Sequence, residues 1–253
     1  MLKVGDYVTR KKYGNDILFK VDKIVNNTVY LKGVEIRLYA DSSKEDLILS
    51  SFSKKKDDFD KIRELNIKDF FYIPGTILHL DSDQEYIDKC NEYYKTQQIK
   101  VFSYRYKESE FKDNVISLIK KHNPKVLVIT GHDAYYNKDG DYTNMSNYKN
   151  SDNFIQAVKV ARSYEKDHDK LIVIAGACQS NYEELIKAGS NFASSPKRIN
   201  IHALDPAIIA VSVSLSSKNK DIDLIKILGK TKYGTDGMGG IITNGTMYIG
   251  YPR

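Results

Sequence analysis

The chain has 253 residues, with 39 Lys and Arg against 33 Asp and Glu, so its net charge is only +6. A dedicated nucleic-acid binder usually concentrates its positive charge, so from this mild excess we expect no nucleic-acid partner, and the 41% hydrophobic content excludes a disordered chain. Because no apolar run reaches the ~18–20 residues of a membrane span and no secretory signal opens the chain, we expect a cytoplasmic protein without a membrane partner.

The first 48 residues contain short β-type segments separated by turn residues such as Asn26-Asn27. Strands this short and this closely spaced predict a small SH3-like β-barrel over residues 1–48. Residues 49–68 include a run of charged side chains and are predicted to form a linker that leads into a short helix. The strands expected in the barrel cover residues 6–10, 17–21, 28–32 and 36–40.

From residue 69 to residue 253, apolar runs of strand length alternate with amphipathic helical segments. Continuous apolar strands separated by helices predict a doubly wound α/β domain, whose mostly parallel sheet is covered by helices on both faces. The expected strands cover residues 70–80, 99–102, 126–129, 171–174 and 199–202, and a terminal hairpin covers residues 240–249. The expected helices cover residues 84–95, 111–121, 152–164, 182–188, 208–215 and 224–228.

Functional residues of such a sheet belong at the carboxyl ends of its strands. Three side chains stand out there: Asp81, His132 and Cys178. No phosphate-binding loop, dinucleotide fingerprint or clustered metal-ligand spacing is found, so we expect neither a cofactor nor a metal. The other candidates for such chemistry, Cys90, His79, His122 and His168, are predicted to be structural.

His132 and Cys178 follow two apolar strands with one helix between them, so the two strands are expected to be neighbours in the sheet. A thiol has an ordinary pKa of ~8.5, and a nearby imidazole favours its thiolate form and can protonate a leaving amine. This pair therefore predicts a cysteine nucleophile with a histidine general base. The Cys178 N–H and backbone groups at Gly131, Asp133 and Ala177 are the candidates for an oxyanion hole.

The order of an apolar strand with Gly131-His132, a spacer, and an apolar strand with Ala177-Cys178 resembles the caspase-like cysteine peptidases. A closer resemblance, to the YabG family of sporulation-specific peptidases, spans most of the chain. It implies a caspase-like fold and a cytoplasmic mother-cell endopeptidase that processes spore coat and germination proteins, with association with the coat as a second location. The strings that carry it are Leu78-His79-Leu80-Asp81, Thr130-Gly131-His132-Asp133, Ala175-Gly176-Ala177-Cys178-Gln179-Ser180, Asn191-Phe192-Ala193-Ser194-Ser195-Pro196-Lys197-Arg198 and His202-Ala203-Leu204-Asp205-Pro206.

The resemblance also suggests where the substrate is read. In caspase-like enzymes the residue that reads the P1 side chain, just before the scissile bond, often lies about 50 residues before the histidine. Asp81 and Asp83 occupy that region, and a carboxylate there would select Arg. Asp81 is favoured over Asp83, Asp205 is a further candidate, and the alternative is that Asp81 or Asp83 merely caps the next helix.

Two other functions fit the same residues. Cys178 with His202 and Asp205 would suit a glutamine amidotransferase or DJ-1-like hydrolase, in which the cysteine also lies between a strand and a helix. The chain could instead be a spore scaffold protein that has no catalytic activity. Substitution of His132 separates the two enzymes, and substitution of Cys178 separates either enzyme from the scaffold.

Overall fold

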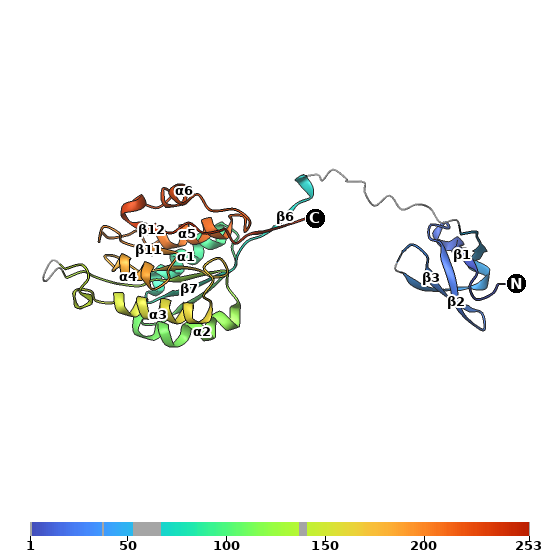
Figure 1. Ribbon diagram of the computed structural model, residues 1–253, viewed down its shortest axis with the longest axis horizontal. Helices are drawn as coiled ribbons and strands as arrows, with labels where there is room; N and C mark the ends of the chain where they lie inside the picture. Colours follow the sequence, from blue (N-terminus) through green and yellow to red (C-terminus); the bar gives the residue numbers. More distant parts are fainter. Residues whose placement is uncertain (1, 37, 53–66, 137–140, 253) are drawn as a thin grey trace. The chain divides into compact units, whose positions relative to one another are not determined.

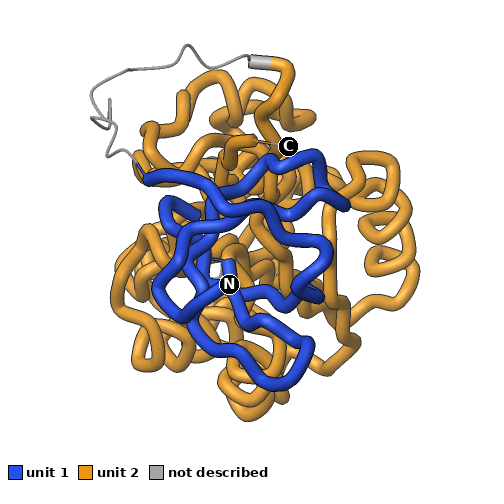
Figure 2. Tube along the Cα trace, turned by 90° about the vertical axis from the view of Figure 1, so that its right-hand side faces the viewer, with its two compact units in different colours: residues 1–64 blue, residues 65–253 orange. Residues whose placement is uncertain are grey.

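The computed structural model describes residues 2–36, 38–52, 67–136 and 141–252. The chain divides into two compact units, residues 1–64 and residues 65–253, which Figure 2 distinguishes by colour. The predicted linker and helix of residues 49–68 fall mostly in residues 53–66, outside the described residues. No helix in the described part of the chain has the length and apolar character needed to cross a membrane.

Unit 1 is an antiparallel sheet of five short strands in the order β4-β3-β2-β1-β5. Alternation along β2 and β3 turns Phe19, Val21, Val29 and Leu31 inward, where they form a small core with Val8. The turn at Asn26-Asn27 connects β2 to β3, as the sequence predicts. The strands are β1 (Tyr7–Arg10), β2 (Phe19–Val25), β3 (Thr28–Gly33), β4 (Tyr39–Ser43) and β5 (Leu47–Leu49).

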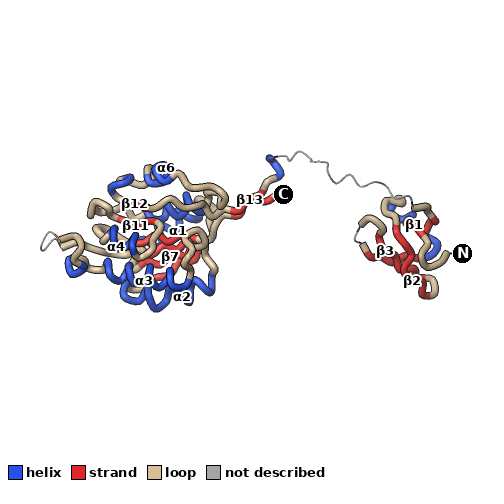
Figure 3. The backbone as a smooth tube through the Cα atoms, in the orientation of Figure 1, coloured by secondary structure: helices blue, strands red, loops and turns tan. Residues whose placement is uncertain are grey.

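Unit 2 is built on a six-stranded sheet in the order β12-β11-β10-β9-β7-β8. Figure 3 shows the strands of unit 2 in red and its helices in blue. Its first five strands in the chain are parallel, and β12 pairs antiparallel with β11 at one edge. The mostly parallel α/β sheet predicted from the apolar runs is thus confirmed. The strands are β7 (Ile77–Asp81), β8 (Val101–Arg105), β9 (Val126–Ile129), β10 (Ile172–Ala175), β11 (Phe192–Ser194) and β12 (Met238–Gly240).

Helices cover both faces of this sheet (Figure 1). One face packs against α2, α3 and α4, and the other packs against α1, α5 and α6. Every residue of β7, β9, β10 and β11 is buried, which explains why β9 and β10 are apolar throughout instead of alternating. The helices are α1 (Gln84–Thr96), α2 (Phe111–His122), α3 (Ser151–Tyr164), α4 (Tyr182–Lys187), α5 (Asp205–Ser214) and α6 (Leu224–Leu228).

The strand predicted at residues 199–202 was wrong. The fifth parallel strand is β11, and residues 199–202 form an irregular segment. Its carbonyl oxygens accept hydrogen bonds from the turn at Cys178: Gln179 N–H donates to Ile199 O, and Cys178 Sγ donates to Ile201 O. The alternation of Ile199 and Ile201 therefore does not reflect sheet pairing.

The terminal hairpin predicted at residues 240–249 was also wrong, because its two arms have different partners. The first arm begins at Gly240, the last residue of β12, which pairs with β11. The second arm lies in β13 (Tyr248–Gly250), which pairs with β6 (Phe71–Ile73) in a separate two-stranded sheet. The Asn244-Gly245 turn fits closely against the segment after α5, where a Cβ on Gly245 would lie 2.1 Å from Ser216 O. Residues 71–73 accordingly belong to this small sheet and do not extend β7.

Candidate active site

The loops after β9 and β10 meet at one edge of the parallel sheet. These strands are hydrogen-bonded neighbours, with Ile129 opposite Ala175, so the chain leaves both at the same level. His132 follows the first strand and Cys178 follows the second. Both line one pocket, together with Asp81, Tyr86, Asp133 and Ala177.

Cys178 lies on a tight turn between two residues with positive φ, Gly176 at +106° and Gln179 at +58°. A Cβ at Gly176 would lie 2.3 Å from Ser194 Oγ, so glycine is required there for space as well as for backbone angle. Gln179 is held in its unusual conformation because its N–H donates to Ile199 O and to Ser195 Oγ. The surrounding loops thus fix the backbone of the half-buried Cys178.

His132 is held through its backbone and through its ring. Its N–H donates to Glu108 Oε1 at 3.0 Å, and its carbonyl accepts from Asn150 Nδ2 at 2.8 Å. The ring nitrogen Nε2 lies 3.0 Å from Asp83 Oδ2, and the Tyr86 ring lies against the imidazole with centroids 5.5 Å apart. The side chain is half exposed and therefore accessible from the pocket.

Asp133 joins the histidine loop to the cysteine loop. Its buried carboxylate accepts from the N–H groups of Ala134 and Asn150 and from the hydroxyls of Ser151 and Ser180. Four donors satisfy a charge that would otherwise be costly to bury. Because Ser180 Oγ also accepts from Ala177 N–H at 2.9 Å, this network extends to the residue before Cys178.

Asp81 ends β7 beside the pocket and is 3% exposed. Burial raises the pKa of its carboxyl, although Thr130 Oγ1 donates to it at 2.5 Å and Asp83 N–H donates at 2.8 Å. Behind it, Thr130 Oγ1 lies 2.8 Å from His79 Nε2, and His79 Nδ1 lies 3.1 Å from the Tyr94 hydroxyl. Burial lowers the pKa of His79 to about 3, so this imidazole is neutral and structural, in line with the sequence interpretation.

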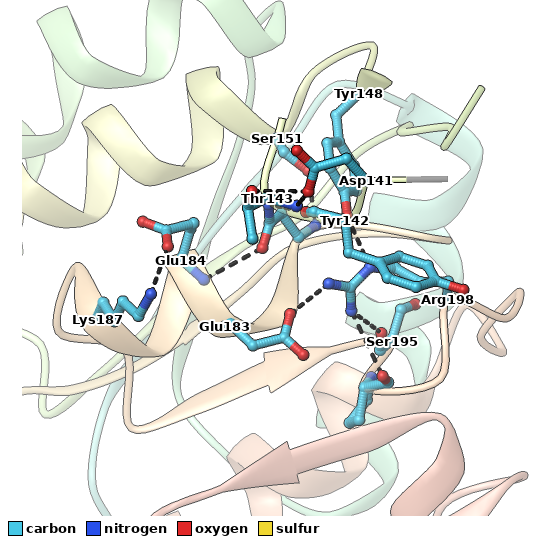
Figure 4. Close-up of polar contacts among 12 residues, drawn as sticks. Asp141, Tyr142, Thr143, Tyr148, Ser151, Glu183, Glu184, Lys187, Ser195 and Arg198 are labelled. Carbon is cyan, nitrogen blue, oxygen red and sulfur yellow. Dashed lines mark hydrogen bonds and ion pairs between the residues drawn. The ribbon is translucent and has the colours of Figure 1, made fainter. Parts of the chain in front are cut away.

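Arg198 ties the outer loops of the site together (Figure 4). Its guanidinium pairs with Glu183 of α4, donates to the Tyr148 hydroxyl at 2.8 Å and donates to Ser195 O at 3.2 Å. It also lies over the Tyr142 ring, 5.3 Å from the centroid. The segment before α3 is therefore fastened to the segment that supports Gln179.

Asp83, Asp205 and His202 are not among the described residues that line the pocket. The buried Asp205 carboxylate accepts the backbone N–H groups of His202 and Lys232, and the His202 Nδ1 atom accepts from Leu204 N–H. The contact between Asp205 and His202 thus uses the backbone and leaves the imidazole out. Cys90 is buried in α1, donates to Ala203 O, and has a pKa that burial raises to about 12.

Sequence reasoning missed the residues that support the site from other elements. Glu108, Tyr86 and Ser180 lie on separate segments, and no spacing in the sequence relates them to His132 or to Asp133. Within the described residues, no group of three or more His, Cys, Asp or Glu side chains is arranged to hold a metal ion.

The sequence matches the family model described as YabG peptidase U57 over residues 3–68 and 50–252. It is also 36% identical to the sporulation-specific protease YabG of Bacillus subtilis (strain 168) over 283 residues, an alignment that covers 99% of this chain and 98% of the relative. No solved structure matches the chain. The matched residues include both loops that form the pocket.

Gly176→Ala should destabilise the protein by about 1–3 kcal/mol more than Gly234→Ala, because the new methyl group at Gly176 would overlap Ser194 Oγ. Gly234 also has a positive φ, of +54°, and nothing lies within 4 Å of its Cβ position, so Gly234→Ala carries only the cost of a left-handed backbone, which is smaller at +54° than at +106°. Urea denaturation of both variants measures the difference. Equal losses would mean that the Cys178 turn relaxes to accept a side chain.

Asp81→Asn should stabilise the free protein at pH 7. The pKa of Asp81 is higher in the folded chain than in the unfolded chain, so the folded chain loses stability as the pH rises from about 4 through the folded pKa. The variant has no such carboxyl, and its advantage should disappear below about pH 4, where Asp81 is protonated in both states. Urea midpoints across this range measure the effect, and an advantage that does not change with pH would contradict the explanation.

Proposed function

The chain belongs to the YabG peptidase U57 family and is a protease, and we propose that its peptidase centre is the pocket between the loops after β9 and β10. Cys178 is the nucleophile and His132 is the general base. The observation that carries this proposal is that both side chains line one pocket at the carboxyl ends of adjacent parallel strands. The near full-length similarity to a sporulation-specific protease supports the same biological role for this chain.

The reaction that we propose is hydrolysis through an acyl-enzyme. The Cys178 thiolate attacks the scissile carbonyl, His132 delivers its proton to the leaving amine, and a water activated by His132 then releases the acyl group. The oxyanion is placed beside the N–H of Cys178 and an N–H of Gly131 or Asp133. Ala177 N–H and His132 N–H already donate to Ser180 and Glu108, which argues against a direct role for either.

Asp81 is the residue that we propose to read the substrate, with Arg as the P1 side chain. It lines the pocket together with Cys178, whereas Asp205 is not among the described residues that line it. Burial disfavours the charge of Asp81, and a guanidinium would compensate it. The same buried carboxylate would repel an acidic P1 residue.

We further propose a caspase-like fold for residues 69–253 and an SH3-like barrel for residues 1–48, joined by residues 49–68. The histidine loop and the cysteine loop follow adjacent parallel strands, which supports the first assignment. Five short antiparallel strands around a small core support the second. The substrates that we propose are spore coat and germination proteins in the cytoplasm of the mother cell.

Cys178→Ala should abolish cleavage of an Arg-containing spore coat protein, because it removes the nucleophile. His132→Ala should reduce the rate about 10²–10⁴-fold, while His202→Ala should cut at nearly the wild-type rate. Cut sites and rates are read by mass spectrometry with purified variants. A fully active His132→Ala variant, or cleavage by Cys178→Ala, would refute the assignment of this pair.

Asp81→Asn should reduce the preference for Arg over citrulline at P1 by about 10²-fold, since citrulline has nearly the shape of Arg but no charge. The rate on the citrulline peptide should change little. Matched fluorogenic peptides give both values of kcat/KM. An unchanged preference would show that another group reads the P1 side chain.

A further inference from the structure

Asp83 stands directly before α1, and three contacts fix its position. Its Oδ1 accepts from Glu85 N–H at 2.9 Å and so caps the helix, and its own N–H donates to Asp81 Oδ1 at 2.8 Å. Its second carboxylate oxygen, Oδ2, lies 3.0 Å from His132 Nε2. The side chain therefore cannot turn toward another partner without losing the cap.

This contact determines which nitrogen of His132 carries the proton. A carboxylate only accepts hydrogen bonds, so the imidazole atom that faces it is an N–H donor. When the ring is neutral, the lone pair is then on Nδ1. Glu108 and Asn150 hold the His132 backbone, and Tyr86 lies against the ring, so Asp83 is the group that sets the tautomer.

We propose that Asp83 is the positioning residue of the catalytic pair: it holds the proton of His132 on Nε2 and leaves Nδ1 as the base. The inference depends on the proposed role of His132 and takes Asp83 out of the candidates for P1 recognition. It adds a third side chain to the centre, in the manner of a triad.

Two of the other carboxylates near His132, those of Glu108 and Asp81, are arranged differently. Glu108 Oε1 accepts from the Ser82 hydroxyl and from the His132 backbone N–H, and Asp81 accepts from Thr130 and from Asp83 N–H. Of these three acids, Asp83 is the one whose hydrogen bond is to the imidazole. The same bond is the main cause that lowers the pKa of Asp83, so the carboxylate is charged when the enzyme works.

Asp83→Asn separates this role from the helix cap. Asn is as good a cap as Asp, and with its Oδ1 kept on Glu85 N–H its amide nitrogen faces His132 Nε2. Two donors cannot share that contact, so the imidazole should move its proton to Nδ1 and lose its base. We expect kcat to fall about 10²–10⁴-fold, with KM and the preference for Arg over citrulline unchanged.

The tautomer can be observed directly. In a Cys178→Ala background, ¹⁵N NMR of the His132 ring should show the proton on Nε2, and the added Asp83→Asn substitution should move it to Nδ1. Asp83→Ser is the second variant, because serine also caps the helix but cannot hold the ring. It should lose activity to a similar degree while its thermal unfolding remains that of the wild type.

The outcomes distinguish this inference from the proposed function. If His132→Ala is inactive but Asp83→Asn has the wild-type kcat, the role of Asp83 is refuted and the catalytic pair stands. If Asp83→Asn keeps kcat but loses the preference for Arg, Asp83 reads the P1 side chain and the inference fails. An active His132→Ala variant would refute both. A tautomer that does not change in the NMR spectrum would also overturn the inference.

Discussion

The buried carboxylate of Asp133 is the interaction on which the geometry of the site depends. It accepts hydrogen bonds from its own loop, from the start of α3 and from Ser180 in the cysteine loop. A charge removed from water needs such partners, so the three segments are stable only when they meet. His132 precedes this carboxylate directly, and Cys178 lies two residues before Ser180. This requirement therefore holds the loops of His132 and Cys178 together at the end of the sheet where the pairing of β9 with β10 already brings them.

Much of unit 2 could be predicted because its central strands have a strong physical signature. Val126–Ile129 and Ile172–Ala175 are buried on both faces and read as unbroken apolar runs, and the helix between them makes neighbouring parallel strands the natural arrangement. β11 could not be predicted, because its three residues, Phe192–Ser194, are too few to show a period. The nearby alternation of Ile199 and Ile201 resembles a strand more than β11 does, but the carbonyl groups of this segment accept hydrogen bonds from the turn at Cys178.

The candidate site was predictable where a residue type and a strand end coincide, as at His132 and Cys178. The sequence favours Asp81 over Asp83 for P1 recognition, but it does not indicate that Asp83 contacts His132, because both acids follow the same strand at almost the same distance from the histidine. In three dimensions, the end of β7 buries Asp81 beside the pocket, whereas the start of α1 turns Asp83 toward the imidazole. Glu108 is recognised only after folding, since its hydrogen bonds cross between elements.

One carboxylate, that of Asp83, serves both the first turn of α1 and the ring of His132. The ends of helices fray more readily than the strands of a buried sheet. Fraying of this first turn would release the imidazole while β7, β9 and β10 remain folded. With His132 as the proposed base, the enzyme would then be inactivated by heat, reversibly, at a temperature below its global melting transition, and its activity would report on local order at one helix end.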